Sequence, residues 1–396
     1  MNEKHRIFVT HKLPYLDRRK YRNFLDIEVN EEELALTSSK VLTKIKNADG
    51  LLVCVTDRID KRILKAARNL KVKRARLLKL FDSLDFTPVQ GLLLEPYHDS
   101  GPGRPFYSPE STAKALMLQR FLRIPSERAL ADELAKCRDY RRICGFKRYT
   151  PSRACFTSFR RRRLGKERFK RVFELMVEQA IALGAVKGLV LAVDSTAFKA
   201  YSARDASNKR GKSDPDADVG RAGRTYILGY RVHLACAEGD VPVAFTVQPI
   251  SRNDKQFYKQ LVAEAWKTGV RFRVVAGDRQ YDSQELRQWT KEAFKAETAI
   301  PKRERGEKPE KGIVVDAKFR VSGPKRLVKL YHKRLSVERI FKKMKRQLSL
   351  ENHHLRGLAN VTIHACLTLM CVLAAVIASY KAGKPKKARS IRYWTN

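Results

Sequence analysis

One carboxylate stands alone in a strongly basic segment near the end of the sequence. Residues 318–346 contain twelve Lys or Arg, and Glu338 is their only acid. On an α-helix, at about 100° per residue, Tyr331, Arg334, Glu338 and Lys345 would share one narrow face. Such a face attracts a polyanion, while the carboxylate repels it unless a divalent cation lies between them. The segment therefore indicates metal-dependent chemistry on nucleic-acid phosphate.

An ordinary structural role for Glu338 is the alternative. It could pair with Arg334 four positions earlier and with Lys342 four positions later. Pairs of this kind stabilise a helix by roughly 0.2–0.5 kcal/mol each. The segment alone leaves both interpretations open, so the other acids of a metal site must be sought upstream.

Two further acids follow apolar runs that are typical of buried strands. The run GLVLAV is followed by Asp194, and the run VRFRVVAG by Asp278. A single acid at a strand end is commonly a turn residue, but two strands that each deliver an acid are more than a coincidence of turns. Asp282 precedes a helical stretch with Glu285 three positions on, which is a capping-box pattern. We therefore assign Asp282 to capping and Asp278 to chemistry.

The order of the expected elements predicts the fold class. Two strands follow the Asp194 strand, at residues 226–236 and 241–250, and the turn AEGD between them indicates an antiparallel pair. A helix, the Asp278 strand and the Glu338 helix complete the series. We predict an α/β domain with a mixed five-stranded sheet and flanking helices, preceded by a small all-helical domain.

The basic segment also fits a longer pattern. Its residues match Y-x2-R-x3-E-x6-K at all four positions, and this resembles the signature of the DDE transposases of insertion sequences. The block GDRQYDS is similar to the block that carries the second acid in that family, with Gln280 in place of an expected Gly or Ala. The stretch 105–185 looks like the small helical N-terminal domain of many such transposases. The resemblance covers about residues 105–380.

The resemblance implies an RNase H-like core with Asp194, Asp278 and Glu338 as its triad. Three carboxylates held together rise in pKa unless divalent cations neutralise them. Oxygen ligands suit Mg²⁺ or Mn²⁺ better than zinc, and the sequence has no His and Cys cluster with zinc spacing. We expect two such ions on the triad, which cleave DNA by in-line displacement and join its 3′-OH to target DNA.

Double-stranded DNA is the expected partner, both as terminal inverted repeats and as target. The resemblance implies phosphate or base contacts from Tyr331, Arg334 and Lys345. In the helical domain, residues 108–136 fit a helix-turn-helix element with Ser126 as an N-cap. We expect further phosphate contacts from the basic block after it, Arg160, Arg161, Arg162 and Arg163. A solvated helix face would also explain that block. Synapsis of two DNA ends requires two active sites, so a homodimer or higher assembly is expected.

Composition agrees with a DNA-binding enzyme. The chain of 396 residues has 83 Lys and Arg against 42 Asp and Glu, a formal net charge of +41. Such an excess suggests a polyanionic partner. A ribosomal or histone-like binder would share the charge but rarely needs 43% hydrophobic residues. Seven cysteines without a C-x-x-C pair, and no secretory signal, predict a cytoplasmic, nucleoid-associated protein.

The predicted organisation has four parts. Residues 1–75 have no assigned role, 76–185 form the helical DNA-binding domain, 186–380 the catalytic domain, and 381–396 a basic tail. Within the catalytic domain, residues 204–224 are predicted to be a surface loop. The apolar stretch 359–380 is long enough to cross a bilayer, but polar residues interrupt it, which favours a buried core helix over a membrane span.

Two other functions remain open at this point. The chain could be a DNA-binding descendant that keeps the acids but no longer cuts. It could also be an RNase H-like nuclease, such as a junction resolvase, that cleaves without joining strands.

Overall fold

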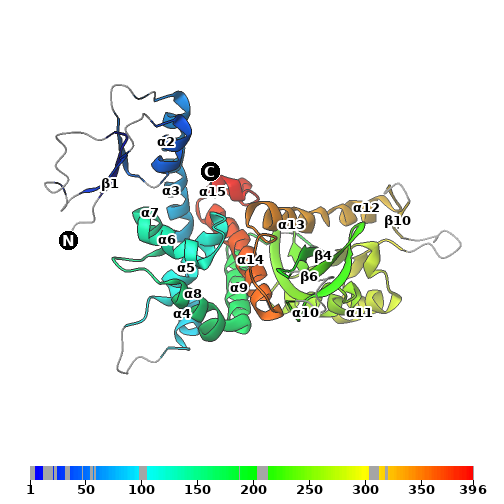
Figure 1. Cartoon of the computed structure of the whole chain (residues 1–396). Coiled ribbons are helices and arrows are strands. Elements are labelled where there is room, and N and C mark those ends of the chain that lie inside the picture. Colours follow the sequence, from blue (N-terminus) through cyan, green and yellow to red (C-terminus); the bar gives the residue numbers. More distant parts are fainter. Residues whose placement is uncertain are drawn as a thin grey trace.

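The computed structural model describes residues 5–11, 21, 25–31, 36–46, 48–53, 57, 59–97, 105–186, 188–202, 213–302, 312–316 and 320–395. They form a small N-terminal sheet, a group of helices and an α/β core (Figure 1).

The N-terminal part is a parallel three-stranded sheet. Its strands are β1 (His5–Val9), β2 (Leu25–Val29) and β3 (Gly50–Leu52), in the order β2-β1-β3, accompanied by α2 (Ser38–Ile45). The long helix α3 (Lys61–Asp82) joins this sheet to the remainder of the molecule (Figure 1). Neither the sequence nor this arrangement assigns it a function.

The next part is helical, as predicted. Its elements after α3 are α4 (Thr87–Leu94), α5 (Pro109–Phe121), α6 (Glu127–Lys136), α7 (Arg138–Cys144), α8 (Arg153–Ser158), the π-helix η1 (Phe159–Leu164) and α9 (Gly165–Ala182). The predicted cap of α6 is confirmed, because the Ser126 hydroxyl accepts a hydrogen bond from the Ala129 amide at 3.1 Å.

The core sheet confirms the predicted fold class. Its strands are β4 (Val190–Lys199), β5 (Asp218–Ala222), β6 (Thr225–Ala237), β7 (Val241–Pro249), β8 (Val274–Gly277) and β9 (Glu297–Ala299). Five of them run in the order β7-β6-β4-β8-β9, and β5 extends the sheet by pairing with β6. The β4-β6 and β6-β7 pairs are antiparallel, whereas β4-β8 and β8-β9 are parallel. This is a mixed RNase H-like sheet.

Helices cover both sides of this sheet. In chain order they are η2 (Asp254–Phe257), α10 (Tyr258–Lys267), η3 (Arg279–Tyr281), α11 (Gln284–Phe294), α12 (Lys325–His332), α13 (Leu335–Gln347), α14 (Leu358–Lys381), η4 (Pro385–Lys387) and α15 (Ile391–Thr395). A small hairpin, β10 (Val314–Val315) and β11 (Val321–Ser322), precedes α12. In Figure 1, α12 and α13 lie along one side of the sheet, and α10 and α11 along the other.

The loop predicted at residues 204–224 is wrong in its described part. Residues 213–224 include strand β5 and a buried acid, Asp214. The Asp214 carboxylate accepts hydrogen bonds from the Tyr230 hydroxyl at 2.8 Å and the Gly357 amide at 3.1 Å. This acid therefore ties β6 to the start of α14. The run was predicted to be a loop because it is polar and contains glycine, although residues 218–222 pair with the adjacent strand β6.

Helix α14 is the core helix that the sequence favoured. It is the one helix in the described residues that is long and apolar enough to cross a membrane, and 94% of its apolar window is buried inside the protein. It packs against α9, α5 and β7. Two of its polar residues bond within the protein: His364 bonds to the Leu350 carbonyl, and the Ser379 hydroxyl accepts from the Trp394 indole.

The predicted basic tail is a folded element. Trp394 and Ile391 of α15 are buried, and α15 packs against α3. The hydrophobic core runs without a break from α3 through the helical part and the sheet to α15.

Candidate active site

Two neighbouring parallel strands place Asp194 and Asp278 side by side. In the β4-β8 register Val193 pairs with Gly277, so the next residue of each strand is an aspartate. Adjacent strands lie roughly 4.8 Å apart. Asp278 accepts a hydrogen bond from the Arg279 amide at 2.6 Å, which fixes its carboxylate at the start of η3.

Glu338 comes from α13, but not from one continuous helix. The sequence placed Tyr331, Arg334, Glu338 and Lys345 on one continuous helix, and this continuity is wrong. Helix α12 ends at His332 and α13 begins at Leu335, with two residues between them. Between them the chain tightens into i→i−3 bonds, with the Arg334 amide donating to the Tyr331 carbonyl at 2.9 Å. The junction contains no Pro or Gly from which the break between the two helices could have been predicted.

Arg334 forms ion pairs with both Asp194 of β4 and Glu338 of α13. Its guanidinium lies 2.8 Å from the Asp194 carboxylate and 2.7 Å from the Glu338 carboxylate. The i,i+4 pair that served as the structural alternative is therefore present. It is part of a larger group, because the same arginine reaches β4 across the sheet edge.

The electrostatics of this group favour an added cation. The pKa of Asp194 is raised to about 6, mainly by burial and also by the charges of Asp278 and Glu338, against the opposing effect of Arg334. Burial alone would lower the pKa of Arg334, but contact with Asp194, Tyr331 and Glu338 leaves it raised. One arginine thus faces three carboxylates, which leaves the group with more acid than base.

The donor set suits a hard divalent cation, because it consists of carboxylate oxygens. In the described residues, however, no group of three or more His, Cys, Asp or Glu side chains is arranged to hold a metal ion. Arg334 separates Glu338 from Asp194 in this conformation. The residues fit the ion chemically, and the Arg334 side chain has to move for all three carboxylates to share it.

Comparison with protein families agrees with this geometry. The family model Transposase DDE domain matches residues 186–374, and the model Transposase domain (DUF772) matches residues 65–162. The chain belongs to the DDE transposases of insertion sequences. A comparison with curated proteins found no match. The two matched regions of the transposase correspond to its α/β core and to most of its helical part.

The predicted DNA contacts of the transposase near Glu338 differ in exposure. Tyr331 is only 7% exposed, because its ring packs on strands β4 and β8, and burial raises the pKa of its hydroxyl. The Lys345 ammonium donates to the Ala197 carbonyl at 2.6 Å and pairs with Glu351 at 2.9 Å. Lys345 is therefore tethered to the strand that carries Asp194.

The four arginines of the basic block differ in exposure. Arg160 is 2% exposed and donates to Glu127 and Asn360, each at 2.7 Å. A phosphate contact does not fit this buried side chain, since its guanidinium already holds η1 to α6 and α14. Arg161, Arg162 and Arg163 are exposed. Consecutive arginines diverge around a helix, so a run of four cannot share one face.

The assignment of Asp282 to capping is also corrected. The N-cap of α11 is Ser283, whose hydroxyl accepts from the Leu286 amide at 3.5 Å. Asp282 instead pairs with Arg287 at 2.7 Å. Its role remains structural.

A fourth acid beside the triad was missed. Asp254 is buried at the start of η2, where its carboxylate accepts from the Ser195 hydroxyl at 3.0 Å and from Arg231 at 3.3 Å. Its other oxygen lies 3.6 Å from the His233 ring. Burial raises the pKa of Asp254, and the charge of Asp278 raises it as well. The signal in the sequence is Arg231 and His233, two polar residues at strand spacing within an apolar strand.

A cavity of about 1100 Å³ opens next to these residues. Its walls include Ser195 and Arg279, the immediate neighbours of Asp194 and Asp278. Asp254 is also on the wall, with four more bases, Arg221, Arg231, Arg252 and Lys345. The cavity therefore joins the acidic group to a basic surface.

Proposed function

We propose that this transposase binds the terminal inverted repeats of its insertion sequence, cleaves the DNA at these ends and joins the 3′-OH to target DNA. The observation that carries the proposal is the grouping of Asp194, Asp278 and Glu338 around Arg334 at one edge of the sheet. Two of these acids are delivered by the adjacent strands β4 and β8, and the third by α13, which packs on β4.

Asp194, Asp278 and Glu338 would hold two Mg²⁺ or Mn²⁺ ions. When bound, such ions activate an attacking water or 3′-hydroxyl and stabilise the leaving 3′ oxygen. The carboxylates serve as ligands once Arg334 turns away from them. A freed Arg334 is then a donor for a phosphate oxygen at the same position, since its guanidinium forms bidentate contacts with oxyanions.

The basic cavity would bind the strand that is cut. Arg279 adjoins Asp278, and Lys345 is held at β4 by the Ala197 carbonyl, so both cations have a fixed relation to the triad. A chain of phosphates along these side chains would place one phosphodiester against the carboxylates. We keep Tyr331 as a DNA contact, because its ring lies beside the Arg334 guanidinium, 5.5 Å from the ring centroid.

The helical part would bind the DNA ends. Arg161, Arg162 and Arg163 are exposed on η1. A cavity of about 830 Å³ adjoins them, lined by aromatic rings such as Tyr97 and Tyr149 and by the bases Arg148 and Arg163. Rings and guanidinium groups together suit nucleotides, whose bases stack and whose phosphates pair with arginine.

The assembly would contain at least two copies, because two element ends are cut and joined together. We place it in the cytoplasm at the nucleoid, where its DNA substrate lies.

The decisive experiment is Mg²⁺-dependent cleavage and joining of DNA that carries the flanking element ends. The intact chain is compared with Glu338→Gln, which keeps the shape of the side chain and removes its charge. We expect the intact chain to cut and join, and the variant to bind without doing either.

Each other outcome identifies a rival. Binding without cleavage by the intact chain would indicate a non-catalytic DNA-binding descendant. Cleavage without joined products would indicate a nuclease or resolvase. Equal cleavage by the Glu338→Gln variant would contradict the assignment of the triad.

A further inference from the structure

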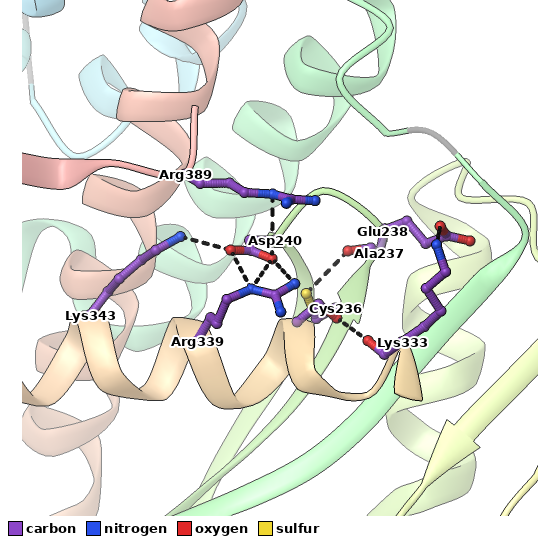
Figure 2. A network of polar contacts seen from close by, with 9 residues as sticks. Cys236, Ala237, Glu238, Asp240, Lys333, Arg339, Lys343 and Arg389 are labelled. Carbon is purple, nitrogen blue, oxygen red and sulfur yellow. Dashed lines mark hydrogen bonds and ion pairs between the residues drawn. The ribbon is translucent and has the colours of Figure 1, made fainter. Parts of the chain in front are cut away.

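The turn between β6 and β7 holds the helix that carries Glu338. This turn has the sequence AEGD and supplies two acids, Glu238 and Asp240. Figure 2 shows both carboxylates meeting basic side chains that extend from α13 and from its junction with α12. Neither acid belongs to the carboxylate group around Arg334.

Asp240 is completely buried and surrounded by cations. Its carboxylate accepts from the Arg339 guanidinium at 2.7 and 2.9 Å and from the Lys343 ammonium at 3.1 Å. Arg389, from the segment before α15, approaches to 3.9 Å. Burial alone would raise the pKa of Asp240, but its hydrogen bond from Arg339 and the charge of Lys343 hold it below its usual value. The carboxylate is therefore charged and directionally bonded.

Glu238 makes the second connection. One of its oxygens accepts from the Leu189 and Val190 amides, at 3.1 and 3.2 Å, where β4 begins. The other lies 3.0 Å from the Lys333 ammonium, in the junction between α12 and α13. The strand that carries Asp194 and the helix that carries Glu338 are thus joined through one side chain.

The cations held by the turn flank the residues of the site. Lys333 immediately precedes Arg334, and Arg339 immediately follows Glu338. Consecutive side chains on a helix diverge by about 100°. Arg334 and Glu338 therefore face the triad while their neighbours face the turn. The segment between them is fixed at both ends.

Apolar packing alone does not set this register. Val337, Ile340 and Met344 are fully buried and hold α13 on the sheet. Apolar contacts are non-directional, whereas charged hydrogen bonds fix orientation. Glu338 itself is 45% exposed and is anchored by Arg334. Its location therefore depends on where the helix places it.

We propose that Asp240 and Glu238 are positioning residues, which hold α13 in register so that Glu338 meets Asp194 and Asp278. This inference rests on the proposed function of the carboxylate triad. It predicts that loosening the turn weakens metal binding at a site that the turn does not touch.

The test is Asp240→Asn, with Mg²⁺-dependent cleavage as the readout. Asp240 has a positive φ of 65°, which Asn also adopts readily, so the variant changes the charge and not the backbone. We expect the Mg²⁺ concentration for half-maximal cleavage to rise about tenfold or more, with recovery at high Mg²⁺, as for other residues that orient metal ligands. Glu238→Gln should act in the same direction. Glu285→Gln on α11, at an exposed ion pair with Lys259 of α10, is the matched control and should leave the titration unchanged.

Other outcomes separate this inference from the proposed function. A lower melting temperature with an unchanged Mg²⁺ titration would make Asp240 merely structural and overturn the inference. If the intact chain does not cleave, Tb³⁺ luminescence without DNA decides instead: weaker binding by Asp240→Asn supports positioning, and equal or absent binding in both proteins overturns it. If Asp240→Asn does not fold, Arg339→Gln, which leaves the Lys343 contact in place, is measured in the same way.

Discussion

Helix α13 separates two clusters of acids and bases that behave in opposite ways. On one flank Asp194 and Glu338 share Arg334, with Asp278 close by. On the other, Asp240 alone meets Arg339, Lys343 and Arg389 (Figure 2). Burial acts on both aspartates, yet the pKa of Asp194 is raised to about 6 and that of Asp240 is lowered.

The ratio of charges explains the difference. Three acids around one arginine leave negative charge that a divalent cation can neutralise, whereas one acid among several cations is already compensated. Burial of a carboxylate alone therefore does not indicate a metal site. The excess of acid over base distinguishes the cluster that would bind metal from the cluster that holds the helix.

The largest expected effect is on activity. Asp194→Asn and Asp278→Asn should each lower DNA cleavage on the order of 10³-fold or more, because each removes a charged ligand of the catalytic group. Binding of end DNA should persist. Single-turnover cleavage and a gel-shift assay measure the two properties. Retained cleavage in either variant would remove that residue from the triad.

The same substitution should affect stability differently in the two clusters. Asp240→Asn should lower the free energy of unfolding by about 2 kcal/mol, because it leaves cations facing an amide. The loss stays below the 3–5 kcal/mol of fully buried pairs, since Arg339 is 44% exposed. Asp194→Asn should change stability by less than about 0.5 kcal/mol, because it also relieves repulsion. Urea unfolding monitored by circular dichroism gives both free energies of unfolding. Equal losses in the two variants would contradict the difference between the clusters.

Low pH should reduce the folding stability through His233, a buried histidine next to the carboxylate group. Burial and the charge of Arg231 together lower the pKa of this histidine to about 3, so the folded protein keeps the ring neutral. The unfolded chain takes up a proton on this residue below about pH 6.5, so the contribution of His233 to stability should fall as the pH drops from there, whereas Asp194, with its raised pKa, contributes in the opposite direction. The expected loss by pH 5 is about 2 kcal/mol from this residue.

Melting temperatures between pH 5 and 8 test this, with His233→Gln as the comparison. His364, whose pKa burial also lowers, contributes a second term that remains in the variant. A pH dependence that is as steep in His233→Gln as in the intact chain would contradict the prediction.

The smallest effect is expected at the arginine block. Arg162→Ala should reduce the salt dependence of DNA binding by about one phosphate contact and leave stability unchanged. Arg160→Ala should instead destabilise the fold, since Glu127 and Asn360 would each lose a part-buried hydrogen bond. Binding isotherms at several salt concentrations and thermal melts separate these roles. Similar behaviour of the two variants would contradict the division of the block.

Local patterns explain what could be predicted. Asp194 and Asp278 follow apolar runs, and the direction of those runs already brings both acids to one edge of the sheet. The antiparallel pair at the AEGD turn and the core helix α14 were predicted for the same reason, since apolar periodicity and turn residues are local signals. The break between α12 and α13 has no such signal and was missed.

The sequence by itself determined the mixed sheet, the helical part before it and the three acids, because burial patterns and turn chemistry act between near neighbours in the chain. Tertiary structure alone decided which charges meet. Arg334 reaches Asp194 from 140 residues away, and Asp240 binds Arg339 across 99. Arg160 is buried only because Glu127 and Asn360 surround it. Whether a charged side chain serves chemistry, DNA or the fold depends on the partners that folding brings to it, and composition and spacing carry no record of them.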